Sequence, residues 1–206
     1  MTDTTFRIIL VAVFIVHTVS GFYFWRKSKS DGEKIDRRKE GLFILIGIRL
    51  LSGIYGIGVV AWLINPDGMA WASLQAPLWL RWIGVGLVVI AASLVAWGLH
   101  TLGKNFTDSV VTKKEHTLVT SGPYRFVRHP LYSCYFLIVL GTALLMANWF
   151  PAVAGGVVLT LVVIRTRTEE QKLIERFGDE YRLYMSKTSR FLPRIFSDPH
   201  FFPFPS

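Results

Sequence analysis

Long apolar stretches, each bounded by polar or turn-forming residues, alternate along the chain with segments rich in lysine and arginine. Of the 206 residues, 51% are hydrophobic, and they gather in blocks instead of the apolar–polar alternation of a soluble domain. A helix needs about 20 apolar residues to cross a bilayer, and these blocks approach or reach that length. The sequence predicts spans at residues 6–25, 42–64, 78–99, 131–148 and 151–164.

The positive charge is confined almost entirely to the segments between these stretches. The formal net charge is +9, and of the 23 lysines and arginines seven lie in residues 26–40, five in 100–130 and eight from Arg165 onward. Basic segments mark the cytoplasmic side of a membrane protein, and five spans place all three on one side. We therefore expect an integral, multi-pass membrane protein with its N-terminus outside, its C-terminus in the cytoplasm and no nucleic-acid partner.

Beyond Arg167 the apolar residues change from a continuous block to a helical period. A spacing of three to four residues, with basic residues between, predicts an amphipathic helix at the cytoplasmic face. The expected fold class is all-α, with about five transmembrane helices followed by this helix. Within one structural unit, residues 1–99 form three N-terminal spans and residues 100–206 form the region that carries the chemistry. The residues with the amphipathic spacing are Leu173, Ile174, Phe177, Tyr181 and Tyr184.

Polar residues are concentrated in two segments that this topology places at the cytoplasmic side, 116–132 and 165–170. One helical hairpin separates them, and because a hairpin returns the chain to its starting face, the segments should meet. Arginine binds carboxylates, glutamate accepts hydrogen bonds from hydroxyl and amino groups, and tyrosine packs near rings or cations. This set suits a zwitterionic ligand that carries a nucleoside. The side chains expected to converge are Arg128, His129, Arg165, Glu169 and Glu170.

These segments resemble the signature of the isoprenylcysteine carboxyl methyltransferase family. The resemblance covers about residues 105–193, and the related phospholipid methyltransferases share a looser form of it. The order of the motifs and the hairpin between them agree with the family. The matching motifs are His-Thr-Leu-Val at 116–119, Thr-Ser-Gly-Pro-Tyr at 120–124, Arg-His-Pro-Leu-Tyr at 128–132, Arg-Thr-Arg-Thr-Glu-Glu at 165–170 and Phe-Gly-Asp-Glu-Tyr at 177–181.

The resemblance implies a membrane methyltransferase that uses S-adenosyl-L-methionine to methylate a lipid-like or isoprenylcysteine-type carboxylate acceptor at the cytoplasmic face. It implies that Arg165 or Arg167 faces the acceptor, and Arg128 is a further catalytic candidate. The expected partners are the bilayer and an amphiphilic or prenylated acceptor, with no metal and no obligate protein partner. The expected donor-binding residues are His116, Thr117, Leu118, Val119, Tyr124, His129, Pro130, Leu131, Tyr132, Glu169 and Glu170.

Other functions are compatible with the same residues. A membrane reductase of the sterol type has a similar C-terminal arrangement and binds NADPH, although this chain is short for that class. A non-catalytic membrane adaptor would not need the ligand-type residues that both segments carry. Within the methyltransferase interpretation, the acceptor group can be a prenylcysteine carboxylate, a phospholipid amine, a small thiol or another lipid.

Overall fold

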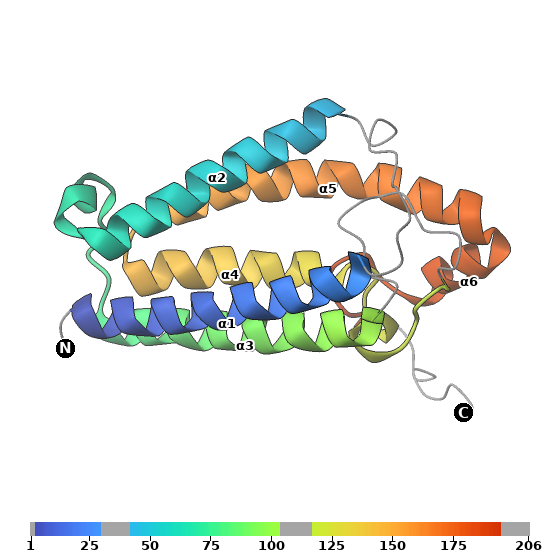
Figure 1. Ribbon diagram of the computed structural model, residues 1–206, viewed down its shortest axis with the longest axis horizontal. Helices are drawn as coiled ribbons and strands as arrows, with labels where there is room; N and C mark the ends of the chain where they lie inside the picture. The colour runs from blue at the N-terminus through green and yellow to red at the C-terminus, as the bar shows by residue number, and fades with distance from the viewer. Residues whose placement is uncertain (1–2, 30–41, 104–116, 195–206) are drawn as a thin grey trace.

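The computed structural model describes residues 3–29, 42–103 and 117–194, and the regular elements within these ranges are all helices. Four are long and apolar enough to cross a membrane, and a fifth apolar helix is shorter, at 17 residues. The predicted all-α membrane fold is confirmed. The long helices are α1 (Asp3–Lys29), α2 (Leu42–Ile64), α3 (Leu78–Leu102) and α5 (Phe150–Phe177), and the shorter ones are α4 (Pro130–Met146), α6 (Asp179–Lys187) and the 3-10 turns η2 (Asp67–Ala72) and η4 (Gly122–Arg125) (Figure 1).

The helices pack in two groups that α4 and α5 join. α3 runs along α4 with α1 beside it, whereas α2 runs along α5 (Figure 1). The backbones of α3 and α4 are in contact at Gly84 and Gly141, where a Cβ added to Gly84 would lie 2.6 Å from the Gly141 carbonyl oxygen. Small residues allow such close approach, which favours helix association in lipid because packing there cannot draw on the exclusion of water.

A buried asparagine holds the turn between α4 and α5. Ala147 adopts a left-handed conformation (φ 48°) that ends α4. The Asn148 side chain donates from Nδ2 to the Met69 carbonyl at 3.2 Å and accepts at Oδ1 from the Phe150 amide at 2.9 Å. These bonds tie the turn to η2, and the reversal returns the end of α5 to the end of the bundle at which α4 begins.

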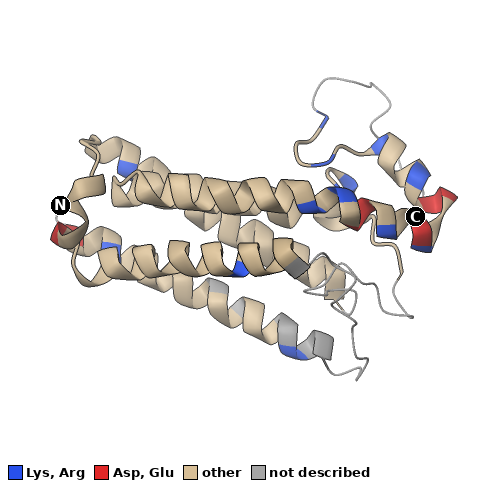
Figure 2. Cartoon of the chain, turned by 90° about the horizontal axis from the view of Figure 1, so that it is seen from above, with Lys and Arg blue, Asp and Glu red and all other residues tan. Residues whose placement is uncertain are grey.

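The two ends of the bundle differ in charge. Figure 2 shows most of the described lysines and arginines at the end where the C-terminus lies. At the opposite end Arg7 donates to the Leu63 carbonyl (2.7 Å) and Arg81 donates to the Leu145 carbonyl (2.9 Å), which caps the last turns of α2 and α4. Arg81 also pairs with Asp3 at 2.7 Å, so these two arginines secure α1 and α3 to their neighbours.

The C-terminal helix differs from the prediction. α5 does not stop with its apolar block but continues as one helix through residues 165–170 to Phe177. The single amphipathic helix expected over 173–184 is wrong, because Gly178 takes a positive φ of 56° that separates α5 from α6. The apolar spacing persists across this break, so the period alone does not reveal it. The turn allows α6 to fold back toward η4.

Candidate active site

The start of α4 is set by a proline and by the turn before it. η4 precedes α4, and Pro130 occupies the first turn, where its missing amide hydrogen and fixed φ suit a helix start. His129 is the residue just before the helix, and its carbonyl accepts from the Tyr132 amide at 3.1 Å. This geometry fixes Arg128 and His129 at the basic end of the bundle.

The chain after α6 returns across the start of α4, and we call residues 188–191 the C-terminal strap. The Arg128 amide donates to the Ser189 carbonyl at 2.9 Å, and the His129 amide donates to the Arg190 carbonyl at 3.0 Å. Ser133 adds a side-chain bond to the Phe191 carbonyl at 2.6 Å. The strap therefore pairs the backbone amides of the two residues that lead into α4, one of which is its N-cap residue His129.

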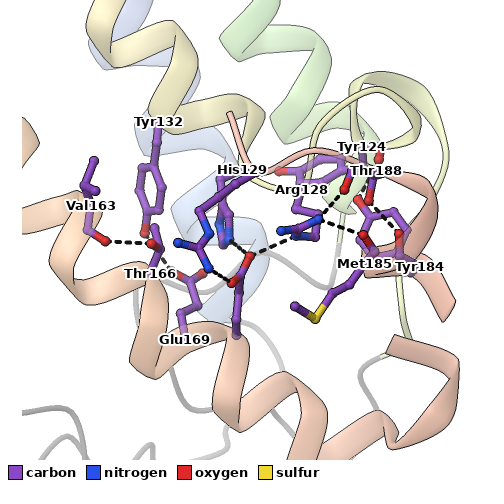
Figure 3. A network of polar contacts seen from close by, with 12 residues as sticks. Tyr124, Arg128, His129, Tyr132, Val163, Thr166, Glu169, Tyr184, Met185 and Thr188 are labelled. Carbon is purple, nitrogen blue, oxygen red and sulfur yellow. Dashed lines mark hydrogen bonds and ion pairs between the residues drawn. The ribbon is translucent and has the colours of Figure 1, made fainter. Parts of the chain in front are cut away.

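Glu170 is the centre of a buried ionic network in which three basic side chains contact one carboxylate. Arg128 Nε lies 2.9 Å from Oε1, and His129 Nε2 lies 3.3 Å from the same oxygen. Arg190 of the C-terminal strap pairs with Oε2. Arg128 also donates from Nη1 to the carbonyls of Met185 and Thr188, so the network joins α5, the start of α4 and the end of α6 (Figure 3).

Glu169 has a different environment from its neighbour. It is half-buried, and its Oε2 accepts a hydrogen bond from the Tyr132 hydroxyl at 3.0 Å (Figure 3). The Tyr132 ring in turn stacks on the His129 imidazole, with 5.5 Å between centroids and an angle of 12° between planes. An aromatic face, a carboxylate and an imidazole therefore lie together beside the buried network.

Tyr184 connects α6 to η4. Its hydroxyl is buried and donates to the Tyr124 carbonyl at 2.5 Å. Burial raises the pKa of the Tyr184 hydroxyl, which keeps it protonated as the donor. Tyr184, one of the aromatic residues of the predicted amphipathic helix, thus docks α6 onto the segment that leads to α4.

The structure brings five of the predicted site residues into one set of contacts, and the other predicted residues differ in their burial and surroundings. Leu131 packs with Val95, Leu99 and Cys134 on the α3 side of α4. Thr117 is exposed and Leu118 and Val119 are half-buried in the extended segment before η4, whereas Pro130 and Tyr124 are buried. Arg165 is half-buried and Arg167 is exposed. His116 lies outside the described residues. The residues that converge are Arg128, His129, Tyr132, Glu169 and Glu170.

The contribution of the C-terminal strap is not predictable from a motif in the sequence. Arg190 of the strap is an ion partner of Glu170, Ser133 donates to the strap at the Phe191 carbonyl, and Thr188 of the strap donates to the Tyr184 carbonyl of α6. The only signal for Arg190 is a basic residue between the amphipathic helix and the Phe191-Leu192-Pro193 sequence, which does not indicate a partner.

The fold and this cluster define the class of the protein. It is an all-α integral membrane protein whose polar residues from two separated segments converge at the basic end of the bundle. The model of the isoprenylcysteine carboxyl methyltransferase family matches residues 83–175, which include α4 and both polar segments.

Known proteins give the same assignment. A protein-S-isoprenylcysteine O-methyltransferase from Mus musculus is 38% identical over 136 residues, which are 63% of this chain and 47% of that protein. A probable protein-S-isoprenylcysteine O-methyltransferase from Oryza sativa subsp. indica is 30% identical over 132 residues, covering 63% of this chain and 69% of that protein. The chain belongs to the isoprenylcysteine carboxyl methyltransferase family.

The fold is also that of a solved member. The structure of a eukaryotic intramembrane Ras methyltransferase, an isoprenylcysteine carboxyl methyltransferase, matches with a TM-score of 0.55 at 20% identity, over 89% of this chain and 67% of that one. The chain spans about half the length of the mammalian relatives that it matches. Membership of this family supports the methyltransferase interpretation over the sterol-reductase and adaptor alternatives.

Proposed function

We propose that this protein transfers the methyl group of S-adenosylmethionine to the carboxylate of a prenylated cysteine, at the cytoplasmic face of its membrane. The observation that carries the proposal is the meeting of Arg128, His129 and Tyr132 with Glu169 and Glu170. These residues belong to two of the motifs that resemble the family, and they lie at the start of α4 and in the later part of α5, the two helices of the hairpin. The basic end of the bundle is the cytoplasmic end in this proposal, as the charge distribution favours.

The two glutamates have separate roles in this proposal. Glu170 is 3% exposed and engages two guanidinium groups and an imidazole, so it serves as the internal anchor of the site. Glu169 is half-buried and engages the neutral hydroxyl of Tyr132. Its carboxylate is therefore the better candidate to accept hydrogen bonds from the donor's hydroxyl or amino groups.

The residues present fit the donor. The stacked pair of Tyr132 and His129 offers an aromatic surface, and aromatic faces attract a cationic sulfonium. Arg165 lies four residues before Glu169 on α5 and so shares its side of the helix, and a guanidinium suits an acceptor carboxylate. Arg167, which is exposed, lies on a different side. We therefore assign the acceptor-facing role to Arg165.

Methyl transfer to a carboxylate requires the protein mainly to align the two reactants and to exclude water. S-adenosylmethionine supplies a methyl group already activated by its sulfonium: the acceptor oxygen forms a bond to the methyl carbon, the sulfur–carbon bond breaks, and sulfur keeps the electron pair. A carboxylate is ionised at neutral pH, so no side chain has to remove a proton. The opposite charges of the reactants disappear in the products, which a site shielded from water favours. Holding the reactants in line can contribute about 7–11 kcal/mol.

The test is methyl transfer by the full chain in detergent micelles or lipid nanodiscs. The purified protein is incubated with methyl-tritiated S-adenosylmethionine and N-acetyl-S-farnesylcysteine, and base treatment of the product releases methanol only from a methyl ester. We expect ester formation that depends on the prenyl group, with N-acetylcysteine, which lacks the tail, as the control. If the protein binds the donor but labels a lipid amine and no prenylcysteine, the acceptor is an amine and not a carboxylate. Thermal stabilisation by NADPH, and not by S-adenosylmethionine, would contradict the methyltransferase proposal.

A further inference from the structure

The side of α4 that carries Tyr132 continues into the membrane as a row of polar residues. Tyr135 lies three residues after Tyr132, and Thr142 lies seven residues after Tyr135, which are spacings that keep side chains on one side of a helix. At a rise of 1.5 Å per residue, Tyr135 lies about 4.5 Å deeper along α4 than Tyr132. The row therefore starts at the proposed site and leads away from the basic end.

Two of the polar groups in this part of the bundle satisfy each other. The hydroxyls of Tyr55 on α2 and Thr142 on α4 share a hydrogen bond. The rings of Tyr55 and Tyr135 meet edge to face, with their centroids 6.5 Å apart. α2 packs along α5, and through Tyr55 it also reaches α4.

The third hydroxyl stands out within the described part of the chain. The Tyr135 oxygen is buried and has no hydrogen-bond partner among the described residues. A buried hydroxyl without a hydrogen-bond partner lowers stability. Its neighbour Tyr55 is already engaged with Thr142. A ligand that enters between the basic end and the hydrocarbon region would supply the missing partner.

We infer that Tyr135 is a specificity-determining residue that donates a hydrogen bond to the head of the acceptor, next to the methylated carboxylate. The inference rests on the proposed function. The donor is a polar molecule that arrives from the aqueous end, whereas the acceptor's tail lies in the bilayer, so a residue on the membrane side of Tyr132 faces the acceptor. The carboxylate itself must point at the methyl group, and a thioether sulfur accepts hydrogen bonds weakly. The remaining acceptor is the amide carbonyl that precedes a prenylated cysteine.

The variant that tests this is Tyr135→Phe, which keeps the ring and removes only the hydroxyl. With N-acetyl-S-farnesylcysteine we expect the acceptor KM to rise about five- to tenfold, the range of one neutral hydrogen bond. The donor Kd should stay unchanged, and the thermal midpoint should be equal or higher because an unpaired buried group has been removed. Tyr55→Phe is the matched control: it breaks the bond to Thr142, so it should lower the thermal midpoint and leave the acceptor KM unchanged.

A second acceptor identifies the bonded atom. S-farnesyl-3-mercaptopropionate keeps the tail and the carboxylate but lacks the amide. With this acceptor, the KM of the wild type should rise to that of Tyr135→Phe, and the KM of the variant should not rise further. An unchanged KM for Tyr135→Phe on the amide-bearing acceptor would overturn the inference while the proposed function stands, and a persistent difference on the amide-free acceptor would overturn the carbonyl assignment. A wild type that methylates neither compound overturns the proposed function, and this inference falls with it.

Discussion

Arg128 and Glu170 are 42 positions apart in the sequence, yet Nε of one lies 2.9 Å from Oε1 of the other and both side chains are less than a tenth exposed. The pair joins the start of α4 to α5 at the basic end of the bundle. Because Arg128 also donates to the carbonyls of Met185 and Thr188, the same guanidinium holds the end of α6. The geometry supports a positioning role for Arg128 through these protein partners.

Removing the charge of Glu170 should act mainly by lowering the stability of the fold. In Glu170→Gln the buried guanidinium of Arg128 loses its counterion, and breaking a buried pair on one side costs about 3–5 kcal/mol. We expect a lower thermal midpoint in detergent. The double variant with Arg128→Gln should be less destabilised than the sum of the two single changes, and simple additivity would contradict a direct coupling.

The C-terminal strap should depend on Arg190. Arg190→Gln removes one of the basic partners of Glu170, and we expect faster amide hydrogen exchange at His129 and weaker donor binding. Arg190→Lys should recover part of both, because it restores the charge without the planar guanidinium. Arg194, which bonds the exposed Ser186 carbonyl, is the matched control, and equal effects of Arg190→Gln and Arg194→Gln would argue against a specific role for the strap.

Much of this architecture is predictable from sequence because lipid imposes a simple rule on it. Backbone groups in a bilayer must be satisfied within a helix, so the apolar blocks translate directly into α2 and α3, whose starts agree with the expected positions. The meeting of Arg128 and His129 with Glu169 and Glu170 follows from the same logic, since one hairpin can only return the chain to its starting face.

The details that sequence did not supply depend on single residues and on side-chain geometry. Gly178 breaks the amphipathic helix through a backbone angle that leaves the apolar period intact. The approach of Arg190 to Glu170 requires the chain to cross α4 after that break, and no local pattern encodes the crossing. Likewise, adjacent glutamates look equivalent in sequence, and only their partners distinguish the buried Glu170 from the half-buried Glu169.

The distinction between the glutamates predicts different outcomes for the same substitution. Glu169→Gln should weaken the binding of S-adenosylmethionine about tenfold or more, the loss of one or two charge-assisted hydrogen bonds, and should change the thermal midpoint little. Titration calorimetry and thermal unfolding of the same preparation measure both. Tyr132→Phe, which removes the hydroxyl that binds Glu169, should weaken donor binding less. Full donor affinity in Glu169→Gln would remove this residue from the proposed site.

Arg165 and Arg167 of α5 should also differ in their effect on methyl transfer. Arg165→Gln should lower kcat/KM for the acceptor by about tenfold to a hundredfold, because a guanidinium that aligns the carboxylate is lost, while the donor Kd changes little. Arg167→Gln is the control with the same change of charge two residues away, on the exposed side. A larger loss in Arg167→Gln than in Arg165→Gln would reverse the assignment of the acceptor-facing residue.

The contact between α3 and α4 should be sensitive to a single methyl group. In Gly84→Ala the new Cβ would lie 2.4 Å from the Leu145 amide nitrogen, so the two backbones must move apart, and overpacking of this kind costs about 1–3 kcal/mol. Gly86→Ala is the matched control on the same helix, because a Cβ there meets nothing within 4 Å and alanine favours the helix. Thermal unfolding in one detergent should show a lower midpoint for Gly84→Ala and an equal or higher midpoint for Gly86→Ala. Since α4 carries His129 and Tyr132 at its start, Gly84→Ala should also weaken donor binding, and wild-type stability of that variant would mean that the α3–α4 contact is looser than its geometry requires.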